Sequence, residues 1–243
     1  MSEEQLVPGT KYPVTGYYTG ALKEDRIGRI SGYAKERLPL GTVIPITKQH
    51  GFAGDEHTKI HGGPDRCINH YNENHYARLI KNFPLATATL VAPGFGENIT
   101  TGTNDNGQEL NERNVCIGDV FRLGTALLQV CQPREPCMKV DRFHNCPSKK
   151  SLKTYLIKSA FTGWFYRILE EGTVTVGQDN EIEFVSRMHP QWPVANIVQN
   201  IHTTKKNSNT ALEYLKSVAE LDELAYEPYK KRAVTWLAEQ TQK

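Results

Sequence analysis

The sequence predicts a mainly β domain, closed or sandwich-like, followed by a small helical extension. Short strand-like runs separated by glycine-containing turns recur from residue 26 to residue 185, with two helical segments between them. The pattern changes at His189-Pro190-Gln191-Trp192-Pro193, after which the strand pattern ends and helical spacing takes over. We therefore expect two units, a mainly β domain over residues 1–188 and a three-helix extension over residues 189–243.

Each expected element follows from residue type and spacing. Gly124-Thr125 and Glu171-Gly172 each predict the turn of a hairpin, and Pro84 predicts the end of a helix. The polar run at 103–114 predicts a surface excursion. The expected strands and hairpins are 26–33, 41–46, the hairpin 115–130, the hairpin 163–176, and 182–185. The expected helices are 69–83, 148–159 with Ser148 as N-cap, 194–202, 210–218 and 227–238.

The composition indicates which classes of partner are unsuited to this protein and which cellular compartment suits it. Lys and Arg number 29 against 27 Asp and Glu, a balance that argues against a general nucleic-acid or membrane binder. The start, Met1-Ser2-Glu3-Glu4, does not resemble a secretory signal, and no apolar run is long enough to cross a bilayer. The five cysteines have no paired spacing. A reducing compartment, the cytoplasm, is therefore expected.

Cys137 is the first candidate functional residue. It lies in Gln132-Pro133-Arg134-Glu135-Pro136-Cys137-Met138-Lys139, directly after the expected hairpin. The two prolines cannot donate backbone hydrogen bonds, so regular structure should stop there. Nearby Arg134 and Lys139 favour the thiolate, the form that attacks or binds metal. The alternative is a buried core cysteine, since free cysteine is among the most buried residue types.

A glycine-rich polar stretch runs from residue 51 to residue 66. Gly62 and Gly63 permit a ligand to approach the backbone closely, and Arg66 offers a fork of donors suited to phosphate or carboxylate. His57 and His61 are four residues apart, a spacing that weakly suggests zinc, although no third ligand is obvious. The remaining alternative is a turn with solvent-facing polar residues.

Four sequence blocks in this order resemble the MOSC-domain family, named for the C-terminal domain of molybdenum cofactor sulfurases, and its YiiM-type branch with a three-helix extension. Together they span most of residues 26–185, and Cys67 departs from the small apolar residue common in relatives. The blocks are Gly54–Arg66, Gly94–Ile99, Gly118 to Lys139, and Gly163–Gly172.

The resemblance implies a barrel-like domain that binds the molybdenum cofactor, a molybdopterin, with Cys137 as the molybdenum ligand. A thiolate suits the soft metal. The cofactor's phosphate would need fixed donors, and its pterin ring or the substrate would need hydrogen-bonding and proton-transferring groups. The candidates for the phosphate are Arg66, Arg134, Lys139, Gly62 and Gly63, and those for the ring and the protons are His61, Asp55 and Asn98.

Two functions follow from the resemblance, and a third from the histidines. The first is reduction of N-hydroxylated bases or hydroxylamine-type compounds, which requires a separate electron-donor protein because no flavin or dinucleotide fingerprint is present. The helical extension would then offer a docking surface for that donor. The second is a non-catalytic module that binds the cofactor or carries sulfur as a Cys137 persulfide. The third is a zinc hydrolase that uses His57 and His61.

Overall fold

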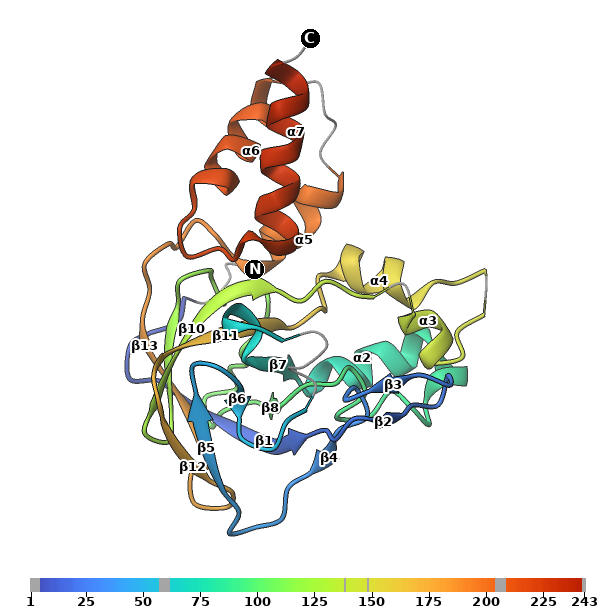
Figure 1. Cartoon of the computed structure of the whole chain (residues 1–243), viewed down its shortest axis with the longest axis vertical. Helices are drawn as coiled ribbons and strands as arrows, with labels where there is room; N and C mark the ends of the chain where they lie inside the picture. Colours follow the sequence, from blue (N-terminus) through green and yellow to red (C-terminus); the bar gives the residue numbers. More distant parts are fainter. Residues whose placement is uncertain (1–4, 57–61, 138, 148, 204–208, 242–243) are drawn as a thin grey trace.

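A closed seven-stranded barrel forms the centre of the chain (Figure 1). The computed structural model describes residues 5–56, 62–137, 139–147, 149–203 and 209–241. Pairing of the first barrel strand with the last closes the barrel, and the β7–β8 pair is its parallel pair. The strands, in spatial order, are β13 (Glu181–Ser186), β9 (Val120–Leu123), β10 (Ala126–Pro133), β11 (Trp164–Glu170), β7 (Ile68–Asn72), β8 (Ile99–Thr101) and β1 (Lys11–Thr19). The predicted mainly β, barrel-like fold is confirmed.

Short strands extend the barrel at its rim. β4 (Glu36–Arg37) pairs with the end of β1, and β2 (Lys23–Glu24) forms a small hairpin with β3 (Ile30–Ser31). A separate three-stranded sheet consists of β12 (Gly172–Thr175), β5 (Val43–Thr47) and β6 (Gly51–Phe52). The expected strand at 26–33 is therefore a turn followed by β3.

The first predicted hairpin is correct, and the second is wrong. β9 and β10 pair across Gly124, whose φ of 56° requires the left-handed region that glycine tolerates. β12 follows β11 directly but pairs with β5, because both edges of β11 are already occupied by β10 and β7. The alternation of apolar and polar residues predicts that a segment is a strand, but it does not predict which strand pairs with it.

Two further elements differ from the prediction. β1 was not predicted, because Pro13 and Gly16 interrupt its alternating pattern, and its register shifts between Val14 and Gly16. The expected helix at 69–83 is partly wrong, because its first residues form β7 and the helix α2 spans Asn74–Asn82. All of β7 is buried between two neighbouring strands, so its apolar residues show no two-residue alternation.

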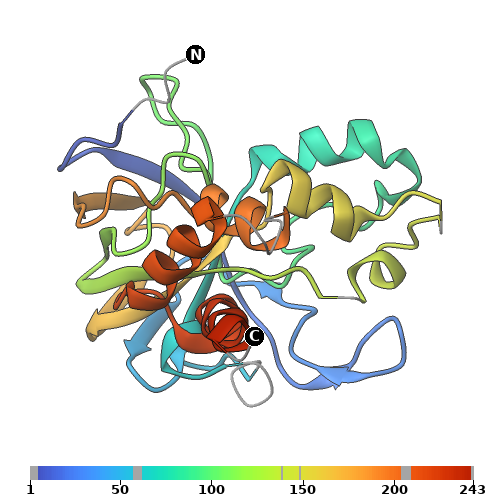
Figure 2. The same cartoon turned by 90° about the horizontal axis from the view of Figure 1, so that it is seen from above.

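A helical layer packs on one side of the barrel and has its own apolar core. It contains α2, α3 (Val140–Phe143) and α4 (Leu152–Ser159), and Figure 2 shows α2 and α4 side by side. Leu79 and Phe83 belong to one buried cluster with Leu152 and Leu156. The N-cap of α4 is Ser151, whose Oγ accepts a hydrogen bond from Thr154 N at 3.1 Å, in place of the predicted Ser148, which lies outside the described residues.

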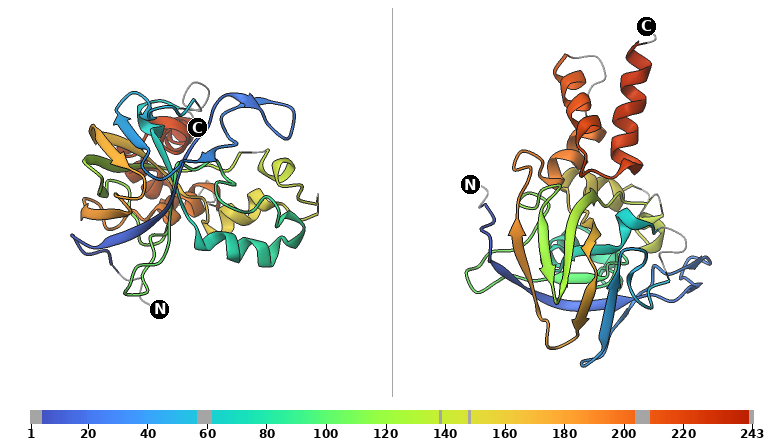
Figure 3. Two further views of the ribbon diagram at one scale, coloured as in Figure 1. Left: turned by 90° about the horizontal axis from the view of Figure 1, so that it is seen from below. Right: turned by 60° about the vertical axis from the view of Figure 1, so that its left-hand side comes forward.

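Three helices form the C-terminal extension, as predicted. They are α5 (Val194–Thr203), α6 (Asn209–Glu220) and α7 (Lys231–Thr241), with the π-helical turn η3 (Tyr226–Lys230) before α7. They project from one end of the barrel (Figure 3). Their apolar side chains share one buried cluster with the barrel interior. The division into units at residues 188 and 189 remains a prediction.

None of the helices in the described part of the chain is long and apolar enough to span a membrane.

Candidate functional site

One pocket, of about 260 Å³, collects most of the predicted site residues. It lies where the β2–β3 hairpin, the turn η1 (Pro64–Arg66), the loop before β8 and the loop after β10 meet. Gly63, with φ 123°, precedes η1 but does not line the pocket, and His61 lies outside the described residues. The predicted residues that line it are Asp55, Gly62, Arg66, Asn98, Arg134, Cys137 and Lys139.

Cys137 lies in an irregular segment beyond the end of β10 at Pro133, as the prolines predicted. Its side chain is exposed at the pocket, which excludes the alternative of a buried core cysteine. Cys67 and Cys131 are buried, and burial raises the pKa of the Cys67 thiol to about 11 and that of the Cys131 thiol to about 12. Cys137 is thus the accessible thiol at this site.

Arg134 brings a buried cation with one unsatisfied nitrogen to the pocket, and its guanidinium also interacts with Tyr33 and with the buried carboxylate of Glu97. The residue is only 6% exposed, and its Nη1 has no hydrogen-bond partner among the residues that the structure describes. The guanidinium carbon lies 5.6 Å from the centre of the Phe95 ring. Asn69, which also lines the pocket, has a buried side-chain oxygen with no partner in the described part of the chain. Buried polar atoms are normally hydrogen-bonded, so these two indicate a polar ligand.

Arg66 and Lys139 add two more cations. Arg66 Nε donates to Gln132 Oε1 at 3.2 Å, which turns the guanidinium toward β10. Lys139 is exposed at the rim. Among the described lining residues, five side chains are cationic and three are carboxylates, so the pocket favours an anion.

Asp55 and Asn98 are held by the protein itself. The Asp55 carboxylate accepts hydrogen bonds from Lys35 Nζ, from Asn98 Nδ2 and, at 3.3 Å, from Gly20 N. Asn98 also accepts from Asn69 N at 3.0 Å, so it connects β7 to Asp55. The carboxylate is therefore neutralised and oriented inside the pocket wall.

Lys35 is a pocket residue that the sequence did not reveal. Its side chain is 1% exposed, and burial lowers the pKa of its ammonium group, an effect that Asp55 opposes. Lys35 is followed directly by Glu36 and Arg37, and such a charged run is typical of an exposed segment. No local feature of the sequence marks Lys35 as buried. Only pairing of β4 with β1 brings it inward.

The other wall of the pocket is aromatic. Tyr33 and Phe143 meet edge to face with ring centres 4.6 Å apart, and Tyr33 donates its hydroxyl hydrogen to Gly94 O at 3.1 Å. Burial raises the pKa of Tyr33 to about 12, so this phenol stays protonated at neutral pH. Phe95 and Phe165 also line the pocket. A flat ligand with an anionic end matches this combination of rings and cations.

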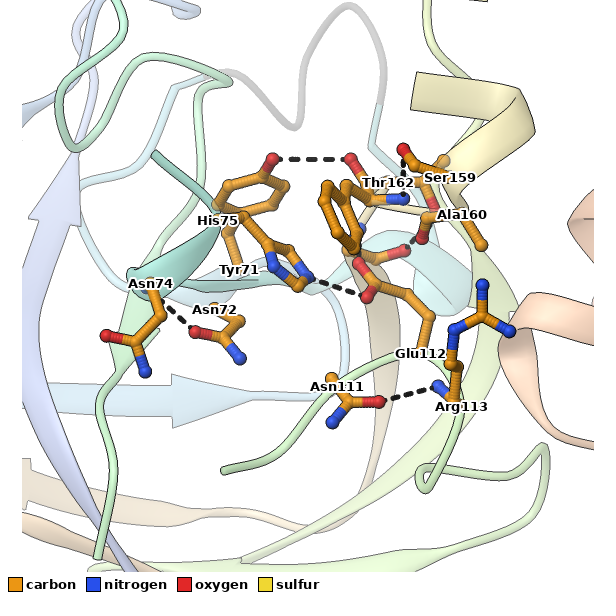
Figure 4. A network of polar contacts seen from close by, with 12 residues as sticks. Tyr71, Asn72, Asn74, His75, Asn111, Glu112, Arg113, Ser159, Ala160 and Thr162 are labelled. Carbon is orange, nitrogen blue, oxygen red and sulfur yellow. Dashed lines mark hydrogen bonds and ion pairs between the residues drawn. The ribbon is translucent and has the colours of Figure 1, made fainter. Parts of the chain in front are cut away.

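A buried network fixes the backbone of Arg134, and Figure 4 shows its His75–Glu112 part. Glu112 accepts from His75 Nε2 at 2.8 Å and from Gly163 N at 2.7 Å, while Gly163 O accepts from Arg134 N at 3.0 Å. Arg78 Nη1 lies 3.0 Å from His75 Nδ1, and since arginine can only donate, the proton of the ring sits on Nε2. The expectation that 103–114 is a surface excursion is wrong at Glu112, which is 1% exposed.

The zinc alternative gains no support from the described residues. They contain no group of three or more histidine, cysteine, aspartate or glutamate side chains that could hold a metal ion. His57 and His61 lie outside the described residues.

Comparison with known proteins identifies the relatives of the chain. The MOSC domain family model matches residues 57–181. Protein YiiM of Escherichia coli is 37% identical over 180 residues, which cover 73% of this chain and 74% of that protein. A protein of Gibberella moniliformis named "Reductase" is 33% identical over 206 residues, which cover 80% of this chain but 34% of that protein. The crystal structure of E. coli YiiM superposes with a TM-score of 0.70 at 26% identity, over 96% of this chain and 94% of that one.

Proposed function

Because this chain belongs to the MOSC family, whose domains are associated with the molybdenum cofactor, we propose that it binds this cofactor and reduces N-hydroxylated compounds. Cys137 would be the molybdenum ligand. The name of the fungal relative, "Reductase", supports a redox role, although this chain spans only about a third of that protein.

The observation that carries the proposal is the unsatisfied Nη1 of buried Arg134. Arginine is suited to phosphate, because its donors form a planar fork. Arg66 and Lys139 would share the phosphate charge with Arg134, and Gly62 would let the ligand approach the backbone. Asn69 offers its free oxygen to an N–H donor on a pterin ring. The residues of the pocket thus fit the cofactor.

When bound, the cofactor would supply the two-electron redox chemistry, with the Cys137 thiolate as a soft ligand. Reduction of a hydroxylamine breaks one N–O bond, consumes two electrons and two protons, and yields an amine and water. Lys35 Nζ is a proton-bearing atom at the pocket, and its hydrogen bond to Asp55 orients it. The electrons would come from a separate donor protein.

Elemental analysis tests the proposal directly. The protein is purified from a host that makes the cofactor, and we expect about one molybdenum per chain, as a single thiolate ligand implies. Cys137→Ser should lose the metal and the reduction of an N-hydroxylated base by a reduced dye. Cys146→Ser is the matched control, because Cys146 is half-buried and does not line the pocket. Metal-free wild type from that host, or metal retained in Cys137→Ser, would contradict the proposal.

The exposure of Cys137 also favours a second candidate, a non-catalytic carrier of sulfur. An accessible thiolate at a basic pocket can take the outer sulfur of a donor persulfide, whose thiol leaves, and pass that sulfur to an acceptor. Mass spectrometry would then find added sulfur on Cys137, and the loaded protein would not turn over N-hydroxylated substrate with reduced dye.

A further inference from the structure

The C-terminal extension contacts the loop that carries Cys137. Arg232, in the first turn of α7, pairs with Glu135 at 2.5 Å between Nη2 and Oε1, and Glu135 is two residues before Cys137. The two side chains are 34% and 24% exposed, so the pair is partly shielded from water. Pro228, from η3, lines the pocket itself together with Glu135.

We propose that the extension is part of the site, and that Arg232 is a positioning residue that holds the Cys137 loop through Glu135. The inference deepens the proposed function, because the loop presents the thiol that would bind the metal.

Backbone hydrogen bonds attach the described part of the loop at few points. Pro133 and Pro136 have no backbone N–H to donate. Arg134 N donates to Gly163 O at 3.0 Å, and beyond Cys137 the bond from Val140 N to Cys137 O, at 3.1 Å, closes a turn within the loop. The ion pair of Glu135 therefore lies between the barrel anchor at Arg134 and the thiol of Cys137.

Arg232 can serve as a tether because its own segment is fixed to the barrel. Ala225 N donates to Cys131 O of β10 at 2.8 Å, and Tyr229 is fully buried in the common core. The Arg232 guanidinium carbon lies 5.9 Å from the centre of the Tyr229 ring. On the pocket side, Arg66 Nη2 donates to Glu227 O at 3.5 Å. Segment 225–232 is thereby fastened to the strand that leads into the loop.

The surrounding charges favour the pairing of Glu135 with Arg232 over a pairing with the neighbouring Lys231. Glu135 faces the first turn of an 11-residue helix, where a carboxylate is favoured by the helix dipole. The neighbouring Lys231 pairs instead with Glu227 at 2.6 Å, and both of those side chains are about half exposed. Lys231 thus provides a matched control, a cation on the same helix turn that does not reach the loop.

Hydrogen exchange on metal-free full-length protein tests the tether. In Arg232→Ala the amides of Arg134, Glu135 and Cys137 should exchange on the order of tenfold faster, while those of α6 stay unchanged. Lys231→Ala should match wild type. The charge-swapped pair Glu135→Arg with Arg232→Glu should restore slow exchange, a rescue that a simple packing role would not produce. Wild-type exchange rates in Arg232→Ala, or no rescue by the swap, would overturn the proposal.

Metal content separates this inference from the proposed function. If wild type holds molybdenum, Arg232→Ala should lose part of it and the charge swap should regain it; unchanged content in Arg232→Ala would overturn the link to the site. If wild type holds no molybdenum, the proposed function fails while the exchange result still decides whether Arg232 positions the loop.

Discussion

Replacement of Arg134 by methionine should remove ligand binding without destabilising the metal-free protein. Its Nη1 is buried without a partner in the described part of the chain, and an unsatisfied buried donor costs about 1–3 kcal/mol. Methionine relieves that cost and keeps much of the volume. The losses are the stacking of the guanidinium on Phe95, worth about 0.5–2 kcal/mol, a hydrogen bond with Tyr33, worth about 0.5–1.5 kcal/mol, and the attraction to the buried Glu97 carboxylate. The relief and these losses largely cancel, so the free energy of unfolding should stay within about 1 kcal/mol of wild type or rise.

A second arginine, partly buried, supplies the control for the same substitution. Arg187 donates to both carboxylate oxygens of Asp119, at 2.9 and 2.6 Å, and the Asp119 side chain is fully buried. Arg187→Met leaves that carboxylate without its cation, which costs about 3–5 kcal/mol. Neither Arg187 nor Asp119 lines the pocket, so Arg187→Met should not affect ligand binding.

Urea unfolding of metal-free protein from a host unable to make the cofactor measures both variants. The two should differ by at least about 2 kcal/mol, with Arg134→Met the more stable. In protein from a cofactor-making host, Arg134→Met should contain no molybdenum, whereas Arg187→Met should retain it. If Arg134→Met is as unstable as Arg187→Met, the donor is satisfied in solution and the reasoning about the pocket is wrong.

Three further predictions concern buried groups. Burial, with Arg134 and Arg26 nearby, lowers the pKa of His144 to about 4, so stability falls as pH drops from about 6.5 toward 4. Between pH 7 and pH 5 wild type should lose about 2 kcal/mol more than His144→Gln does, whereas His50→Gln, at an exposed site, should track wild type. Lys35→Met strands the Asp55 carboxylate and should cost about 3–5 kcal/mol in urea, partly regained in the double variant with Asp55→Asn. Glu112→Gln turns an amide donor toward one of two N–H groups and should lower the unfolding free energy by about 1–3 kcal/mol.

Local chemistry explains which parts of the site could be predicted. Prolines on both sides of Arg134 and Glu135 end the strand whatever surrounds them, so the exposed loop of Cys137 follows from the sequence alone. Likewise, Arg66 lies in the turn η1 and Gly62 lies two residues before it. These residues depend little on long-range pairing.

The residues that could not be predicted depend on contacts between distant segments. Lys35 enters the wall because β4 pairs with β1, and Glu112 is buried because its loop passes between α2 and β11. Arg232 meets Glu135 across 97 positions of sequence. A partner so far along the chain leaves no periodicity in either segment, and a single sequence contains nothing that selects one charge pair over another.

The unsatisfied state of Arg134 itself depends on those distant contacts. A long side chain normally avoids burial without a partner by swinging its charge into water. Here the backbone of Arg134 is fixed by Gly163, Gly163 by Glu112, and Glu112 by His75. Because each link is buried, the backbone of Arg134 stays fixed, and its guanidinium stays buried at the pocket wall with one nitrogen unsatisfied in the described part of the chain. A change that loosens any link should therefore let the guanidinium reach water and weaken ligand binding, without touching a residue of the pocket.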